Sequence, residues 1–144
     1  MQLSKAGLEL IKQFEGCTLT AYLDVVGVPT IGYGHTGGVK LGDTVTQAEA
    51  DAQLEHDVLI RTNAVNNVLI APVTQGQFDA LVSFAYNVGV DNLQRSTLLK
   101  MINRGQAADA GDELLKWNQA GGKVFAGLTR RREAELDLYN EAQA

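Results

Sequence analysis

Residues 14–38 read FEGCTLTAYLDVVGVPTIGYGHTGG, and this stretch joins the end of a predicted helix to a predicted β-hairpin. The helix is expected to end at Gly16, because glycine suits the left-handed position that follows a helix. Two segments rich in threonine, aromatic and aliphatic residues follow, at Thr18–Leu23 and Val28–Tyr33, and such segments are typical of strands. Gly27 marks the turn, so we expect a hairpin centred on that residue.

Three polar residues in this unit stand out, namely Glu15, Asp24 and Thr30. Glu15 falls in the last turn of the helix, and a hairpin centred on Gly27 places Asp24 opposite Thr30. Strand alternation then predicts one face that holds Tyr22, Asp24, Thr30, Gly32 and Gly34. The two glycines would leave open space on that face for a bulky ligand.

These residue types suit the hydrolysis of a glycosidic bond, which needs an acid for the leaving oxygen and a carboxylate for water or the sugar cation. The residues alone also allow a simpler interpretation. Glu15 could be a solvated helix end, Asp24 a turn residue and Thr30 an ordinary strand residue.

A resemblance to a known family covers most of the chain. The run from Phe14 to Gly38 resembles the phage lysozymes, the endolysins of glycoside hydrolase family 24, in the spacing of Glu15, Asp24 and Thr30 before TIGYGH. Further similar segments follow in order: TQAEADAQLEHDV, QFDALVSFAYNVG, STLLKMINRG, and WNQAGG before GLTRRREAELDLY.

The resemblance implies an α+β, mostly helical fold in a single lysozyme domain over residues 1–144. Its parts would be a small N-terminal lobe with a β-hairpin sheet (1–45), a long connecting helix (46–70) and a helical C-terminal lobe (71–144). A cleft between the lobes is the expected place for a polymer.

The resemblance also implies a reaction, the hydrolysis of the β-1,4 bond between N-acetylmuramic acid and N-acetylglucosamine in bacterial peptidoglycan. Glu15 would protonate the leaving oxygen, while Asp24 and Thr30 would hold and activate the attacking water, with inversion. Carboxyl groups about 6.5–9.5 Å apart predict inversion and about 5–5.5 Å predict a covalent intermediate, but a sequence contains no such distance.

Other positions match the family pattern less specifically. Tyr86 and Asn87 match an aromatic–amide pair near the substrate, and Gly32 is expected to bind substrate on the open hairpin face. The alternative for Tyr86 is core packing. The resemblance also places Asp57 where an ion-pair partner for His35 would sit, so we expect a structural brace between the hairpin and the long helix.

Three rival functions remain open. A lytic transglycosylase would need the acid but no water-activating aspartate. A wall peptidase would use Cys17, the only cysteine, with His35. The third rival is a wall-binding module that has lost activity.

Composition limits the partners and the class of protein. A net charge of −5 and a pI near 4.9 argue against nucleic-acid binding, which needs a basic face. We expect no cofactor, and no metal site, because spacings such as HExxH are absent. No apolar run reaches the length of a membrane span, and the N-terminus lacks a signal-peptide pattern. The resemblance implies the glycan strand of the wall as the partner, and we expect a monomer. The protein would be made in the host cytoplasm and act on the periplasmic face of the wall.

The rest of the chain predicts helices. Ser4 is expected to cap the first helix, and Thr46 with Glu49 forms a capping box for a helix that runs to about Leu69. An apolar stripe predicts the next helix, which ends at Gly89. Later helices are expected over Ser96–Asn103, Ala107–Gln119 and Thr129–Ala142.

Two features of the C-terminal part have alternative interpretations. The basic run Arg130–Arg132 is expected to lie on a solvated helix face, the alternative being that one arginine reaches toward Glu15 or the substrate. Trp117 is expected in the core rather than as a platform for a sugar.

Overall fold

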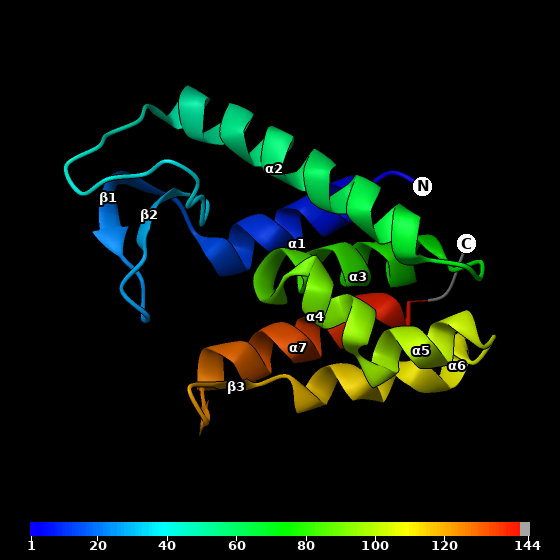
Figure 1. Cartoon of the computed structure of the whole chain (residues 1–144). Helices are drawn as coiled ribbons and strands as arrows, with labels where there is room; N and C mark the ends of the chain where they lie inside the picture. Colours follow the sequence, from blue (N-terminus) through cyan, green and yellow to red (C-terminus); the bar gives the residue numbers. More distant parts are fainter. Residues whose placement is uncertain (142–144) are drawn as a thin grey trace. The chain divides into compact units, whose positions relative to one another are not determined.

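The computed structural model describes residues 1–141, which form two compact units. One unit is Ile11–Ile60, and the other comprises Met1–Leu10 and Arg61–Ala144. The elements of Figure 1 are α1 (Lys5–Glu15), β1 (Thr18–Leu23), β2 (Pro29–Gly32), α2 (Gln47–Val68), α3 (Gln75–Val88), α4 (Val90–Arg95), α5 (Thr97–Asn103), α6 (Ala107–Ala110), the 3₁₀ helix η1 (Gly111–Lys116), β3 (Gln119–Ala120), β4 (Lys123–Val124) and α7 (Ala126–Tyr139). Many helices with two small antiparallel sheets confirm the predicted α+β class.

Within residues 1–141, no helix combines the length and the apolar character that a membrane crossing requires.

Helix α1 has the expected ends. The backbone N–H of Gly7 donates to Oγ of Ser4 at 3.3 Å, so Ser4 caps the first turn as predicted. Ser4 also binds Asp79 of α3, since its backbone N–H donates to Oδ1 of Asp79 at 3.0 Å. At the other end, Gly16 has a φ of +64°, the left-handed conformation that terminates helices.

The hairpin forms, but its predicted register was wrong. Tyr22 rather than Asp24 lies opposite Thr30, and the backbone N–H of Asp24 donates to the carbonyl of Val28 at 3.0 Å. The hairpin is therefore centred on Val26 instead of Gly27. The predicted and observed registers differ by two residues, so Tyr22, Asp24 and Thr30 still belong to the same face of the hairpin. On that face Asp24 and Thr30 are diagonal neighbours.

The side chain of Asp24 explains this register. Its Oδ1 accepts hydrogen bonds from the backbone N–H groups of Val26, at 2.9 Å, and Val28, at 2.8 Å. The turn closes with Gly27, whose φ is +82° and whose N–H donates to the carbonyl of Asp24. A tight turn followed by a left-handed glycine is a common three-residue hairpin loop. Asp24 thus directly follows β1 and closes the hairpin turn.

The unit Ile11–Ile60 is completed by a second partner for β1 and by the first part of α2. The carbonyl of Leu19 accepts from the N–H of Val45 at 2.9 Å, on the edge of β1 that β2 does not use. Thr46 and Glu49 form the predicted capping box, with bonds of 3.0 and 3.1 Å. The buried apolar residues of the unit are Ile11, Ala21, Ile31, Ala50, Leu54 and Val58.

The other unit is a helical core in which α3 packs on α7 (Figure 1). Its fully buried side chains include Phe78, Leu81, Phe84, Leu93, Leu98, Ile102 and Leu114. Trp117 is half-buried and meets the ring of Phe84 edge-on at 5.4 Å, in keeping with the expected packing role.

Two helices expected in this unit need correction, and two short features were not expected. The helix over Ala107–Gln119 is replaced by α6 and η1. Gly111, where η1 begins, packs so closely on α7 that an added Cβ would be 3.0 Å from Leu136 and from Tyr139. Helix α4 and the β3–β4 hairpin were not predicted, because they are too short to show a clear apolar period in the sequence. The last helix ends at Tyr139, and its predicted end at Ala142 lies outside the described residues.

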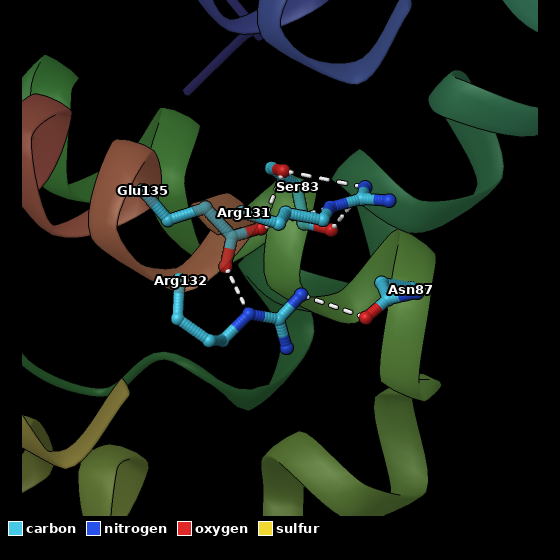
Figure 2. Close-up of polar contacts among 5 residues, drawn as sticks. All are labelled: Ser83, Asn87, Arg131, Arg132 and Glu135. Carbon is cyan, nitrogen blue, oxygen red and sulfur yellow. Dashed lines mark hydrogen bonds and ion pairs between the residues drawn. The ribbon is translucent and has the colours of Figure 1, made fainter. Parts of the chain in front are cut away.

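The basic run was also assigned wrongly, since only Arg130 is exposed, while Arg131 and Arg132 are buried around Glu135 (Figure 2). Nε of Arg132 lies 2.8 Å from Oε1 of Glu135, and Nε of Arg131 lies 3.4 Å from Oε2. The hydroxyl of Ser83 donates to the same Oε2 at 2.5 Å. Burial raises the pKa of the Glu135 carboxyl, and the guanidiniums of Arg132 and Arg131 oppose that rise.

We expect Glu135→Gln to lower the free energy of unfolding by about 3–5 kcal/mol, because both buried guanidiniums would lose their counter-charge. Urea denaturation of the variant against the parent measures this loss. Glu133→Gln is the control, since Glu133 is exposed on the same helix. Equal urea midpoints for the two variants would show that the contacts of Glu135 with the two arginines add no stability.

Candidate functional site

The hairpin places a buried hydroxyl beside an exposed aromatic ring. Thr30 is 4% exposed, and its hydroxyl donates to the carbonyl of Val28 at 2.9 Å. That bond uses the only hydrogen of the hydroxyl, so Oγ1 can act toward a ligand only as an acceptor. Tyr22, directly opposite on β1, is 39% exposed and covers the same face of the hairpin.

The carboxylate of Asp24 has two oxygens with different surroundings. Oδ1 is occupied by the two N–H groups of the turn. In the described part of the chain, residues 1–141, no hydrogen bond to Oδ2 is found. The turn therefore fixes the carboxylate and keeps one oxygen available as an acceptor or base.

Glu15 ends α1, and its carboxyl group lies against the backbone at Gly34. A Cβ atom built on Gly34 would be 2.5 Å from Oε1 of Glu15, closer than such atoms approach in proteins. The carboxyl of Glu15 thus occupies the space that any side chain at position 34 would need.

Tyr22 connects the two carboxylates electrostatically. Partial burial raises the pKa of its phenol, and the negative charges of Glu15 and Asp24 raise it further. Both carboxylates therefore act on one phenol group. Tyr22 was predicted to lie on this face but was not predicted to belong to the site. Its position two residues before Asp24, in a predicted strand, was the available signal.

His35 and Asp57 are in contact, within the unit Ile11–Ile60. Nδ1 of His35 lies 2.8 Å from Oδ2 of Asp57, and Nε2 lies 3.0 Å from the carbonyl oxygen of Gly37. Asp57 is 6% exposed, and Nε2 of Gln53 donates to its Oδ1 at 3.0 Å. The two residues link the segment after β2 to helix α2.

The three expected substrate-binding residues lie in different surroundings. Gly32 is buried, and a Cβ on it would meet Cβ of Ala50 at 3.6 Å, so the open floor predicted at this position was wrong. Tyr86 and Asn87 belong to the other unit. There the guanidinium of Arg61 lies 5.1 Å from the ring centre of Tyr86, and Nη2 of Arg132 donates to Oδ1 of Asn87 at 2.7 Å (Figure 2).

The chemistry of the site is that of carboxyl and hydroxyl groups. Across the residues that the structure describes, no group of three or more histidine, cysteine or acidic side chains is arranged to hold a metal ion. Two carboxyl groups and a hydroxyl acceptor suffice for proton transfer to a leaving group and from a water molecule.

Comparison with known proteins identifies the family. The model of the family described as phage lysozyme matches residues 12–135. The chain belongs to the phage lysozyme family. The endolysin of Acyrthosiphon pisum secondary endosymbiont phage 1 is 41% identical, over 99% of this chain and 100% of the relative. The endolysin of Bacillus phage PZA is 48% identical, over 97% of this chain and 55% of the relative.

Solved structures agree with this membership. The muramidase domain of SpmX from Asticaccaulis excentricus has a TM-score of 0.89 and 41% identity, over 98% of this chain and 99% of that one. The endolysin from Escherichia coli O157:H7 phage FAHEc1 has a TM-score of 0.88 and 42% identity, over 98% of this chain and 94% of that one. This lysozyme-family chain spans about half the length of the Bacillus phage endolysins that it matches.

We expect Asp57→Asn to lower the free energy of unfolding by about 1.5–3 kcal/mol, the usual contribution of a hydrogen bond to a charged group. The substitution removes the carboxylate that His35 and Gln53 both contact. Urea denaturation measures the loss, and Glu55→Gln, an exposed position on the same helix, is the control. Equal midpoints for both variants would show that the contact adds no stability.

Titration of Tyr22 tests the convergence of the carboxylates without any activity assay. Glu15→Gln and Asp24→Asn should each lower the pKa of the Tyr22 phenol toward its usual value of about 10, because each removes a negative charge that disfavours the phenolate. The ultraviolet spectrum of the phenolate reports the titration, and Tyr22→Phe identifies its component. Glu55→Gln should leave the titration curve of Tyr22 unchanged. Unchanged curves for Glu15→Gln and Asp24→Asn as well would mean that these two carboxylates lie far from Tyr22.

Proposed function

We propose that this chain is an endolysin-type muramidase, which hydrolyses the β-1,4 bond between N-acetylmuramic acid and N-acetylglucosamine in bacterial peptidoglycan. The observation that carries the proposal is that one unit holds the carboxyl of Glu15 against Gly34 and fixes the carboxylate of Asp24 in the hairpin turn, diagonal to the hydroxyl of Thr30. Membership of the phage lysozyme family supports it, as does the likeness to a muramidase domain. The substrate would be the glycan strand of the wall, and the monomeric state stays a prediction.

In this proposal Glu15 is the general acid and donates its proton to the oxygen that leaves the anomeric carbon. A water molecule attacks that carbon from the opposite face and loses its proton to Oδ2 of Asp24. Oγ1 of Thr30 accepts a hydrogen bond from the same water, because its own hydrogen is given to Val28. Attack by water without a covalent intermediate inverts the anomeric centre.

The rival functions fit the geometry less well. A peptidase would need a free histidine nitrogen beside the thiol of Cys17, but both ring nitrogens of His35 have partners in Asp57 and Gly37. The thiol of Cys17 instead lies 3.8 Å from Oε1 of Gln47. A lytic transglycosylase needs no base for water, so the free Oδ2 of Asp24 and the acceptor at Thr30 favour hydrolysis.

Mass spectrometry of fragments released from purified cell walls tests the reaction. We expect the parent to release fragments with a hydrolysed N-acetylmuramic acid end, and Glu15→Gln to be slower by about 10²–10⁴-fold, the usual contribution of a general acid. Glu9→Gln is the matched control, since Glu9 is exposed on the same helix. Anhydro sugar ends would instead identify a transglycosylase, and cleaved stem peptides a peptidase.

A further inference from the structure

A tight backbone turn lies beside Glu15. The N–H of Ile31 donates to the carbonyl of His35, and the N–H of His35 donates to the carbonyl of Ile31, each at 2.9 Å. Only Gly32, Tyr33 and Gly34 lie between this pair. Gly32 and Gly34 have φ values of +63° and +78°, a conformation that glycine adopts without strain.

Helix α2 holds this turn at two places. The hydroxyl of Tyr33 donates to Oδ1 of Asp51 at 3.1 Å, and Nδ1 of His35 lies 2.8 Å from Oδ2 of Asp57. Gln47 contacts both partners of the first anchor, at 3.1 Å from the hydroxyl of Tyr33 and 2.9 Å from Oδ1 of Asp51. Because the side chains of its central residue, Tyr33, and of its last residue, His35, are both held by α2, the turn has a defined position on the helix.

The two glycines of the turn face different neighbours. A Cβ on Gly32 would meet Cβ of Ala50 at an ordinary contact distance of 3.6 Å. A Cβ on Gly34 would meet Glu15 instead, at 2.5 Å from Oε1 and 3.3 Å from the carboxyl carbon. Nearby Gly38 has a similar φ of +71°, and a Cβ on it would meet nothing within 4 Å.

We infer that the anchored turn is the surface against which the Glu15 carboxyl rests, and that Gly34 is a positioning residue for it. The inference rests on the proposed role of Glu15 as general acid. A methyl group at position 34 would meet the far end of a flexible side chain, so the carboxyl would move while the backbone keeps its course. A displacement of about 1 Å at a reacting group can cost about 10²-fold in rate.

The test compares Gly34→Ala with Gly38→Ala, which places the same residue at nearly the same φ without a neighbour. We expect kcat on soluble glycan fragments to fall by about 10²-fold in Gly34→Ala relative to Gly38→Ala, with KM changed by less than about threefold. A purely structural role for Gly34 would lower stability in both variants alike and leave their kcat values equal. That equality would overturn the inference.

A second measurement needs no activity. Gly34→Ala should melt at a lower temperature than Gly38→Ala, and the difference should disappear when both are made in a Glu15→Ala background, because the obstructing carboxyl is then absent. If Gly34→Ala alone does not fold, the Glu15→Ala background should restore folding. Failure of that rescue, or a difference that persists, would show that Glu15 is not what Gly34 accommodates.

The outcome for the proposed function is separate. Should Glu15→Gln turn over walls as fast as the parent, the assignment of the acid fails, whatever the glycine variants do. Should Glu15→Gln be inactive while Gly34→Ala and Gly38→Ala turn over equally fast, only the positioning role fails.

Discussion

The geometry of the unit Ile11–Ile60 depends on the pair of backbone hydrogen bonds between Ile31 and His35. They reverse the chain at the end of β2 and so determine where the residues of the turn lie. Tyr33 and His35 then reach Asp51 and Asp57 of α2, and Gly34 is left facing Glu15. Without this reversal, neither anchor to α2 would form, and the backbone would not meet the carboxyl group.

A second constraint in the same unit is the double use of Asp24. One carboxylate oxygen accepts two backbone N–H groups and thereby builds the hairpin turn, which sets the register of β1 against β2. The other oxygen is available for chemistry. Because the same side chain closes the turn, its position is tied to the backbone rather than to a flexible rotamer, which suits the water-holding role proposed for Asp24.

The other unit relies on charge inside its core. Arg131 and Arg132 on α7 converge on Glu135 of the same helix, and Ser83 of α3 completes the set. The network continues to the side chain of Asn87, whose oxygen accepts from Arg132. Buried ions of this kind tie two helices together through groups that tolerate little displacement, since each charge needs its partner to offset lost hydration.

The sequence by itself determined the family and the fold class, through its resemblance to the phage lysozymes, and most of the long elements, because the ends of helices and the faces of strands follow from local chemistry. Capping residues such as Ser4, Thr46 and Glu49 act within one turn of a helix, and glycine at position 16 needs no distant partner. The grouping of Tyr22, Asp24 and Thr30 on one hairpin face also follows from strand alternation. A register error of two residues leaves that grouping unchanged.

Only the tertiary structure decided what those residues meet. The register of the hairpin depends on the side chain of Asp24, which folds back onto its own turn. The burial of Arg131 and Arg132 depends on the Glu135 carboxylate and on a second helix. The burial of Gly32 depends on α2, a helix that starts fifteen residues later. Glu15 and Gly34 come together in the same way. Contacts between segments far apart in the chain leave no periodic pattern in the sequence, so packing alone settles them.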